Sequence, residues 1–246
     1  EGDMGQAVAC LAPAAVATAI SLWGNSTQQE TYLPEFAGDD APAAALVVAE
    51  PHMMFDPFEL KTTAQRSGDG FVLNGLKSAV VRGTEAELFI VAADLEGVGP
   101  SMFIVEAKAE GLSVADDPSM GLRSASLGRL KLDGVEVGAD ALLGSNDDYR
   151  EMIRLSRLAW AGLALGTAKT VLGYVKEYVL NREAFGEPIA YRQAVAFTVA
   201  DMATELEGMR LVTLKAASRA DQGKSFAREV SLARDLAGRY GMQIGT

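Results

Sequence analysis

The stretch Leu73–Gly83, LNGLKSAVVRG, contains a turn-forming dipeptide between two short runs of residues that favour strands. Asn-Gly in this setting is the strongest short-range signal of a β-hairpin. The stretch therefore predicts a strand, a tight turn at Asn74-Gly75 and a second strand after it. Because helical segments precede and follow this region, the hairpin places a β-structure at the centre of the fold.

The sequence around this hairpin has the pattern expected of a β-domain. Short runs such as ELFIVAAD and SMFIVEA are rich in β-branched and apolar residues, and turn-forming residues separate them. Strands that recur about every eight to twelve residues are typical of an antiparallel barrel or sandwich. We expect such a barrel over residues 46–146.

The two flanks are helical in character. Residues 1–45 are rich in alanine, with Ser26 as the expected N-cap of a short helix from Thr27 to about Phe36. From residue 147, two long apolar-striped segments and the start of a third predict an antiparallel bundle, with Gly223 just after the second helix.

The predicted fold class is therefore an α+β multidomain protein. It consists of an N-terminal helical part at 1–45, a central antiparallel β-barrel at 46–146 and a C-terminal antiparallel helix bundle at 147–246. We expect the bundle to be incomplete at its end, because the sequence stops close to a helix.

Composition excludes several classes of function. The 246 residues carry a formal net charge of -11, which argues against a nucleic-acid partner because phosphates would be repelled. The single cysteine and single histidine exclude an intrachain disulfide and a multi-histidine metal site. Without an uninterrupted apolar run of about eighteen residues, we predict no membrane span, and a reducing cytoplasm is the simplest location.

No self-contained catalytic motif is present, such as a glycine-rich dinucleotide loop, a phosphate-binding P-loop or a nucleophile elbow. Four longer stretches nevertheless match one family in order. They are AEPHMMFDPFELKTTA, GDGFVLNGLKSAVVRG, MGLRSASLGRLKLDGVEVGADALLG and NREAFGEPIAYRQAVAFTVADMATELEGMR. On these stretches the chain resembles the acyl-CoA dehydrogenases from about Gly5 to Thr246.

The resemblance implies a fold and a chemistry. A member of this family uses FAD to remove an α proton and a β hydride from an acyl-CoA thioester. A carboxylate is the base, the flavin accepts the hydride, and hydrogen bonds to the thioester carbonyl stabilise the enolate. Electrons normally leave to an electron-transfer flavoprotein, and the enzymes are oligomers.

The residues that the resemblance assigns to the flavin ring differ from the family pattern. The family has a stacking Trp, an Ile and a hydrogen-bonding Thr where this chain has Ala79, Val80 and Val81. The Thr of its T-E-P motif is Ala49 here. Alanine cannot stack on a flavin and valine offers no hydroxyl, so we expect this flavin face to be degenerate.

The residues that the resemblance assigns to the FAD of a neighbouring subunit, the cross-interface set, match the family pattern better than the flavin face does. In the family an Arg, a Phe and a Gln reach the FAD of a neighbouring subunit, and the matching positions are Arg182, Phe185 and Gln193. Arg182 is suited to this role because a guanidinium is always charged and makes forked contacts to phosphate. The alternative for Arg182 is a solvated cation at a helix end.

The catalytic base is the least defined part of the site. The resemblance places the usual base beyond Thr246, and the alternative base position is Ser156, which cannot serve unaided. Arg157 and Asp56 are the residues we assign to the acyl-CoA substrate. No metal ligand is predicted.

Three functions follow as alternatives. The chain is an acyl-CoA dehydrogenase with a divergent flavin pocket, or a partner subunit in a heteromeric enzyme of the kind that bacteria use on sterol-derived thioesters, or an acyl-CoA-binding scaffold without flavin. The contrast between a degenerate flavin face and a preserved cross-interface set favours the partner subunit for catalysis. Homo- and hetero-oligomers, dimeric or tetrameric, both stay open.

Overall fold

The computed structural model describes residues 3–38 and 40–245, and these form two compact units. One unit runs from Gly5 to Ile153, and the other contains the residues from Arg154 onward together with Asp3 and Met4. The N-terminal helices thus group with the sheet, while the division into three domains stays a prediction. Each unit is described by itself below.

The N-terminal helices are α1, Met4–Trp23, α2, Ser26–Tyr32, and the 3-10 helix η1, Leu33–Ala37. The predicted N-cap was wrong by one residue, because Asn25 caps α2. Its side chain accepts from the Gln28 N–H, and the Gln28 side chain accepts from the Asn25 N–H, each at 2.9 Å. This reciprocal capping box satisfies two N–H groups that the helix itself leaves unpaired.

The sheet has eight strands. They are β1, Ala44–Val47, β2, Thr63–Ser67, β3, Gly70–Val80, β4, Leu88–Leu95, β5, Gly99–Glu106, β6, Leu112–Asp116, β7, Gly128–Val137, and β8, Leu142–Leu143, with short 3-10 helices η2, Arg123–Ala125, and η3, Ala139–Ala141. The strand order is β6-β7-β3-β2-β4-β5-β8, with β1 also paired to β4.

The expected antiparallel barrel is wrong in two respects. The sheet is mixed, because β1 and β2 both run parallel to β4, and no described pairing joins the end strands β6 and β8. Strand β5 occupies one edge of β4 along its whole length, so β1 and β2 share the other edge. The chain follows β4 as β1, leaves it in an excursion from Val48 to Thr62, and returns to the same edge as β2.

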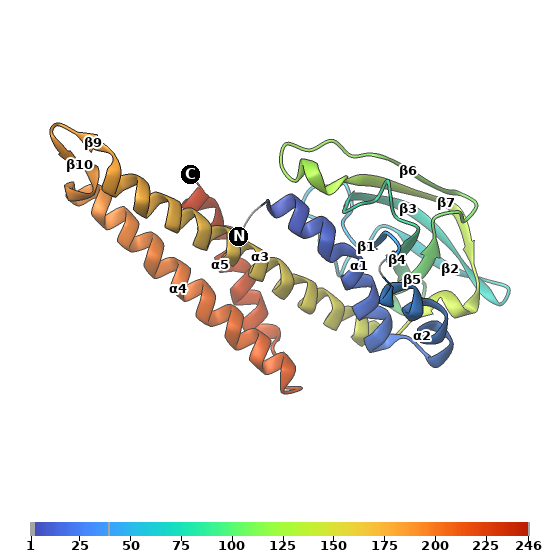
Figure 1. Cartoon of the computed structure of the whole chain (residues 1–246). Helices are drawn as coiled ribbons and strands as arrows, with labels where there is room; N and C mark the ends of the chain where they lie inside the picture. Colours follow the sequence, from blue (N-terminus) through green and yellow to red (C-terminus); the bar gives the residue numbers. More distant parts are fainter. Residues whose placement is uncertain (1–2, 39, 246) are drawn as a thin grey trace. The chain divides into compact units, whose positions relative to one another are not determined.

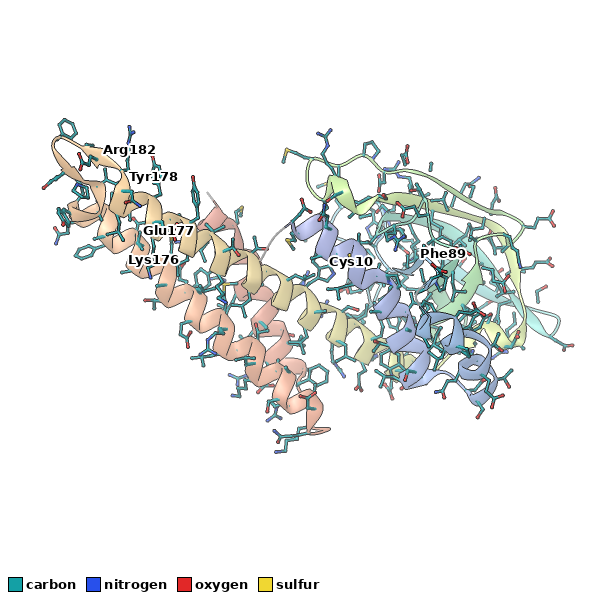
Figure 2. All side chains as sticks on the ribbon, viewed as in Figure 1. Cys10, Phe89, Lys176, Glu177, Tyr178 and Arg182 are labelled. Carbon is teal, nitrogen blue, oxygen red and sulfur yellow. The ribbon has the colours of Figure 1, made fainter. Side chains whose placement is uncertain are left out.

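Strand β4 is buried on both faces, which explains why it reads as a nearly continuous apolar run. Phe89, Val91 and Ala93 pack into a core on one face of the sheet, where Phe71 and Phe103 meet edge to face with centroids 5.2 Å apart. Figure 2 places Phe89 within the sheet.

The other face of β4 packs against helices. Leu88, Ile90 and Ala92 join a second core with α1 and the beginning of α3. The two-residue period of a strand therefore distributes this one run over two cores.

The turn predicted at Asn74-Gly75 was wrong. Strand β3 continues through this dipeptide, and the chain reverses earlier, where Ser67 pairs with Gly70. The β3–β7 register shifts between Leu73 and Gly75, where two residues of β7, Asp133 and Gly134, lie opposite Asn74, so the extra residue belongs to β7. The Asn74 side chain accepts from the Gly134 N–H at 2.8 Å, on the strand opposite, instead of closing a turn of its own.

The remaining helices form the second unit and confirm the predicted bundle segments. They are α3, Asn146–Asn181, whose first eight residues belong to the other unit, α4, Gln193–Asp221, and α5, Ala227–Gly245. Between α3 and α4 lie the strands β9, Glu183–Ala184, and β10, Glu187–Pro188, and the 3-10 helix η4, Ile189–Tyr191. Gly223 has the left-handed φ of +63° expected just after α4.

Two of the described helices, α1 and α3, are long and apolar enough to cross a membrane by length and composition alone. Helices in the core of a soluble protein pass the same test, and α1 contributes Val16, Ala19 and Ile20 to the second core. The predicted lack of a membrane span stays a prediction.

We expect Gly75→Ala to lower the free energy of unfolding by about 2 kcal/mol, because Thr62 leaves no space for a methyl group there. A Cβ at Gly75 would lie 2.7 Å from Thr62 Cα, which is backbone and cannot rotate away. Gly121→Ala is the control, because nothing lies within 4 Å of a Cβ there. Urea unfolding of the two variants checks this, and equal midpoints would contradict it.

Candidate functional site

A buried ion pair lies where the excursion between β1 and β2 meets β3. Lys77 Nζ donates to Glu50 Oε1 at 2.9 Å and to the Val48 carbonyl at 3.1 Å. The side chains of Lys77 and Glu50 are 0% and 2% exposed. An unpaired charge at this depth would be strongly destabilising, so each group requires the other.

Glu50 also holds the far end of the excursion. Its two carboxylate oxygens accept from the backbone N–H groups of Lys61 and Thr62, each at 2.9 Å. Nε2 of His52 lies 3.2 Å from Glu50 Oε2. One carboxylate thus connects the end of β1, the start of β2 and the middle of β3.

The pKa values of the pair reflect this arrangement. Burial by itself would raise the pKa of Glu50, but the Lys61 N–H, the Lys77 ammonium and the Thr62 N–H together lower it to about 2. Burial lowers the pKa of Lys77 to about 8, against the opposing effect of Glu50. Both groups are therefore charged at neutral pH, and Glu50 is a structural acceptor more than a base.

The residues predicted to form the flavin face lie together beside this pair. The Ser78 N–H donates to the Ala49 carbonyl at 3.0 Å, which joins Ala49 to the end of β3. Ala79 has a left-handed φ of +51°, and its N–H donates to Asp117 Oδ2 at 2.8 Å. Asp117 is in turn paired with Arg129 at 2.9 Å. These hydrogen bonds, together with Val80 in the core of the sheet, hold the local backbone.

The chemistry of this face does not fit a flavin ring. Ala49, Ala79, Val80 and Val81 provide no side-chain donor, no hydroxyl and no aromatic ring, and Val80 is buried at 2% exposure. An isoalloxazine ring needs a stacking surface and hydrogen-bond donors. These four side chains therefore offer no group that could act in a reaction step.

The excursion presents two exposed methionines. Met53 and Met54 are 91% and 94% exposed, and Met54 has a left-handed φ of +56°. Neither side chain fills a gap in the core. Asp56, assigned to substrate, accepts from the Phe58 N–H at 2.9 Å and so closes a turn within the excursion. Its contact with substrate stays a prediction.

A hairpin at the joint end of α3 and α4 carries the predicted cross-interface residues (Figure 1). The Arg182 N–H donates to Tyr178 O and its carbonyl accepts from the Ile189 N–H, both at 2.8 Å. Phe185 is 94% exposed at the turn, and Gln193 is the exposed first residue of α4. Figure 2 shows Arg182 beside the hairpin. The structure therefore brings the three residues to one exposed tip.

These three side chains fit a phosphate-bearing ligand better than the flavin face does. Arg182 provides a permanent cation with forked donors, Gln193 provides an amide, and Phe185 provides a ring surface. All three are accessible. This end of the bundle is the part of the described chain that could hold a portion of FAD.

Arg157 and Ser156 lie elsewhere in the bundle unit. Arg157 lines a groove of about 590 Å³ between α3 and α5, together with Trp160, Ser231, Arg234 and Asp235. Ser156 is half-buried on α3. Their assigned roles, toward substrate and as the alternative base position, stay predictions. Among the described residues, no cluster of acidic, His or Cys side chains could hold a metal ion.

One feature of the sequence indicates the ion pair. Lys77 falls at an inward position of β3, in the same core-facing series as Phe71 and Leu73. A lysine in such a position requires a buried carboxylate. Glu50 is that carboxylate, and it joins three parts of the sheet.

Comparison with known proteins agrees on one family. Residues 45–135 match the family model "Acyl-CoA dehydrogenase, middle domain", and residues 148–246 match "Acyl-CoA dehydrogenase, C-terminal domain". A cyclohex-1-ene-1-carbonyl-CoA dehydrogenase from Geobacter metallireducens is 33% identical over 233 residues, which are 91% of this chain and 61% of that protein.

Solved structures show the same likeness. Butyryl-CoA dehydrogenase from Megasphaera elsdenii superposes with a TM-score of 0.87 at 27% identity, over 98% of this chain and 66% of that one. A chain in a structure described as an electron transferring flavoprotein of Acidaminococcus fermentans gives 0.82 at 31% identity, over 93% and 62%. The chain thus spans less than two thirds of the length of these three proteins.

We expect Glu50→Gln to lower the free energy of unfolding by about 3 kcal/mol at pH 7, because it leaves the Lys77 ammonium buried without a countercharge. The stability that wild-type Glu50 contributes is complete above its unfolded pKa of 4.5. It is lost as the pH falls toward about 2.

The variant should therefore lose less stability than wild type between pH 5 and pH 3. Urea unfolding at pH 7, 5 and 3 measures this, with Glu59→Gln, an exposed carboxylate on the same excursion, as control. If Glu50→Gln and Glu59→Gln behave alike, the ion pair is not a structural constraint.

We expect Met54→Gly to raise the free energy of unfolding by roughly 0.5–1 kcal/mol, because glycine adopts a left-handed φ without strain. Met53→Gly is the matched control. It is the same substitution at the neighbouring, equally exposed residue, whose φ is not left-handed. There glycine should be destabilising through chain entropy. Thermal melts that shift both variants in the same direction would contradict the assignment of strain.

Proposed function

Because the chain belongs to the acyl-CoA dehydrogenase family, we propose that it takes part in FAD-dependent α,β-dehydrogenation of an acyl-CoA thioester. It does so as a subunit of an oligomer that shares FAD across its interfaces. Members of the family use FAD, and their names describe oxidoreductases acting on acyl-CoA. Since this chain covers only part of the length of its relatives, its activity, substrate and partners are proposals.

One observation carries the proposal, namely the exposed tip that presents Arg182, Phe185 and Gln193 together. The Phe185 side chain is 94% exposed. Contact with a ligand or another subunit would remove its apolar surface from water, which is favourable. FAD, when bound, supplies the acceptor for the hydride that leaves the substrate β carbon. In this scheme Arg182 binds and orients the anionic part of the cofactor.

The surroundings of the tip support an oligomer. Exposed aromatic residues gather on the segments that meet there, namely Tyr174, Tyr178, Phe185, Tyr191 and Phe197. The rings of Tyr174 and Tyr178 stack with centroids 6.3 Å apart on the surface of α3. Aromatic side chains are enriched at protein interfaces, so this set suits contact with another subunit.

A second candidate function is a non-catalytic partner in a heteromeric acyl-CoA dehydrogenase. The flavin face favours it, because Ala49, Ala79, Val80 and Val81 lack the ring and the donors that a flavin requires. In that case a sister chain holds the flavin ring and this chain contributes its tip. The third candidate, an acyl-CoA-binding scaffold, needs only the groove beside Arg157.

The redox partner that we propose is an electron-transfer flavoprotein. The Acidaminococcus fermentans structure that resembles this chain is described as such a protein, which supports a link between the two kinds of chain. We place the reaction in the cytoplasm, in keeping with the single cysteine.

The direct test is flavin binding by the chain alone and after co-expression with other acyl-CoA dehydrogenase chains. The assembly that binds FAD is then compared with its Arg182→Ala variant. We expect FAD to dissociate at least tenfold more readily from the variant, because a charge-assisted contact to phosphate is lost.

Arg210→Ala is the control. It removes the same charge from an exposed position of α4, where Arg210 is paired locally with Glu207. If no assembly retains FAD, the dehydrogenase proposal fails, and binding of acyl-CoA without flavin would leave the scaffold. If Arg182→Ala and Arg210→Ala retain FAD equally, the tip is not a cofactor site.

A further inference from the structure

Arg192 precedes α4, at a position where an arginine is an unusual choice. It is the N-cap residue, with extended φ and ψ of −79° and 121°, and its side chain makes no capping bond. Ser, Thr, Asp or Asn would accept from a free N–H of the first helical turn at this position. Arginine has no acceptor and adds a positive charge to the positive end of the helix dipole. The carbonyl of Arg192 accepts from the Ala196 N–H at 2.9 Å, but its side chain does not stabilise α4.

The side chain of Arg192 instead folds back onto the β9–β10 hairpin. Its Nη2 donates to the Ala184 carbonyl at 3.2 Å and lies 3.5 Å from Glu187 Oε1. Its guanidinium carbon lies 5.0 Å from the centre of the Phe185 ring. One guanidinium thus contacts both strands of the hairpin and the ring at its turn.

The turn that it contacts is strained. Phe185 and Gly186 have φ values of +59° and +84°, which is the pattern of a type I′ turn. Glycine accepts such a φ, but phenylalanine is an uncommon and costly residue there. The hairpin has two paired residues on each strand, and the bond from the Ile189 N–H to the Arg182 carbonyl closes it at the helix end. An isolated two-stranded hairpin is marginally stable at best, so side-chain contacts add to its stability.

We propose that Arg192 is a positioning residue for the cofactor tip. Its guanidinium fixes the hairpin through Ala184 and Glu187 and supports one side of the Phe185 ring, which leaves the ring exposed for FAD. Arg192 then acts through Phe185 and does not itself need to touch the cofactor. This inference rests on the proposed function, because it specifies how the tip presents its residues.

The test exploits the capping position. Arg192→Asn should stabilise the bundle, because asparagine caps α4, and should at the same time weaken FAD binding by about tenfold, because the hairpin loses its support. If the role of Arg192 were merely structural, the substitution would change thermal stability and FAD affinity in the same direction. The measurements are the melting temperature of the FAD-free protein and the dissociation constant of FAD in the assembly that binds it.

A double-mutant cycle separates positioning from direct contact. If Arg192 acts through Phe185, Arg192→Asn should weaken FAD binding no further in a Phe185→Ala background. Hydrogen exchange at the amides of residues 184–189 should increase in Arg192→Asn even without FAD. Arg210→Ala, which removes a cation from the same helix, should change none of these readouts.

Wild-type FAD affinity in Arg192→Asn, or a lowered melting temperature, would overturn the inference and leave the proposed function in place. Additive effects of the two substitutions would overturn it in favour of direct contact. If the wild-type assembly binds no FAD, the proposed function fails and the inference fails with it.

Discussion

The β-unit depends on the ion pair between Glu50 and Lys77. The chain leaves the edge of β4 after β1 and returns to that edge as β2, so the sheet contains a break that hydrogen bonds of the strands cannot close. Lys77 reaches the carbonyl of Val48 on one side of the break, and Glu50 reaches the N–H groups of Lys61 and Thr62 on the other. Because both charges are buried, neither tolerates the loss of its partner.

The same pair explains why the end of β3 keeps its shape despite its unusual side chains. Glu50 holds the Lys77 side chain, the Ser78 N–H donates to the Ala49 carbonyl, and Asp117 accepts from the N–H of the left-handed Ala79. The backbone that a flavin would face is thus maintained while the side chains that would bind it are missing. At the tip the opposite holds, because Arg182, Phe185 and Gln193 are present and accessible. This asymmetry underlies the proposal of a subunit that contributes to a shared FAD.

The elements that the sequence predicted well are those with a strong local signal. The bundle helices follow from long apolar stripes, and Gly223 follows from the need for a left-handed residue after α4. The turn at Asn74-Gly75 was wrong, because both residues lie within β3, where Asn74 pairs with Thr63 of β2 and Gly75 pairs with Leu132 of β7, and these partners are distant in the sequence. The parallel pairing of β1 and β2 with β4 was missed for the same reason, since it depends on contacts across the excursion.

The site divides in the same way. Family resemblance predicted Arg182, Phe185, Gln193 and the flavin-face positions, and the structure places each group together, while their roles stay predictions. Arg192 was missed because its role depends on folding back over the hairpin, and nothing in the local sequence indicates this. The roles of Asp56, Ser156 and Arg157 stay predictions, because they depend on a substrate.

The most direct test of the account is a structure of the assembly with FAD bound. We predict that the phosphates lie beside Arg182 of this chain, that Phe185 contacts the cofactor, and that no isoalloxazine ring packs against Ala79. An isoalloxazine ring seated on Ala79 and Val81, with Arg182 and Phe185 facing solvent, would contradict the account.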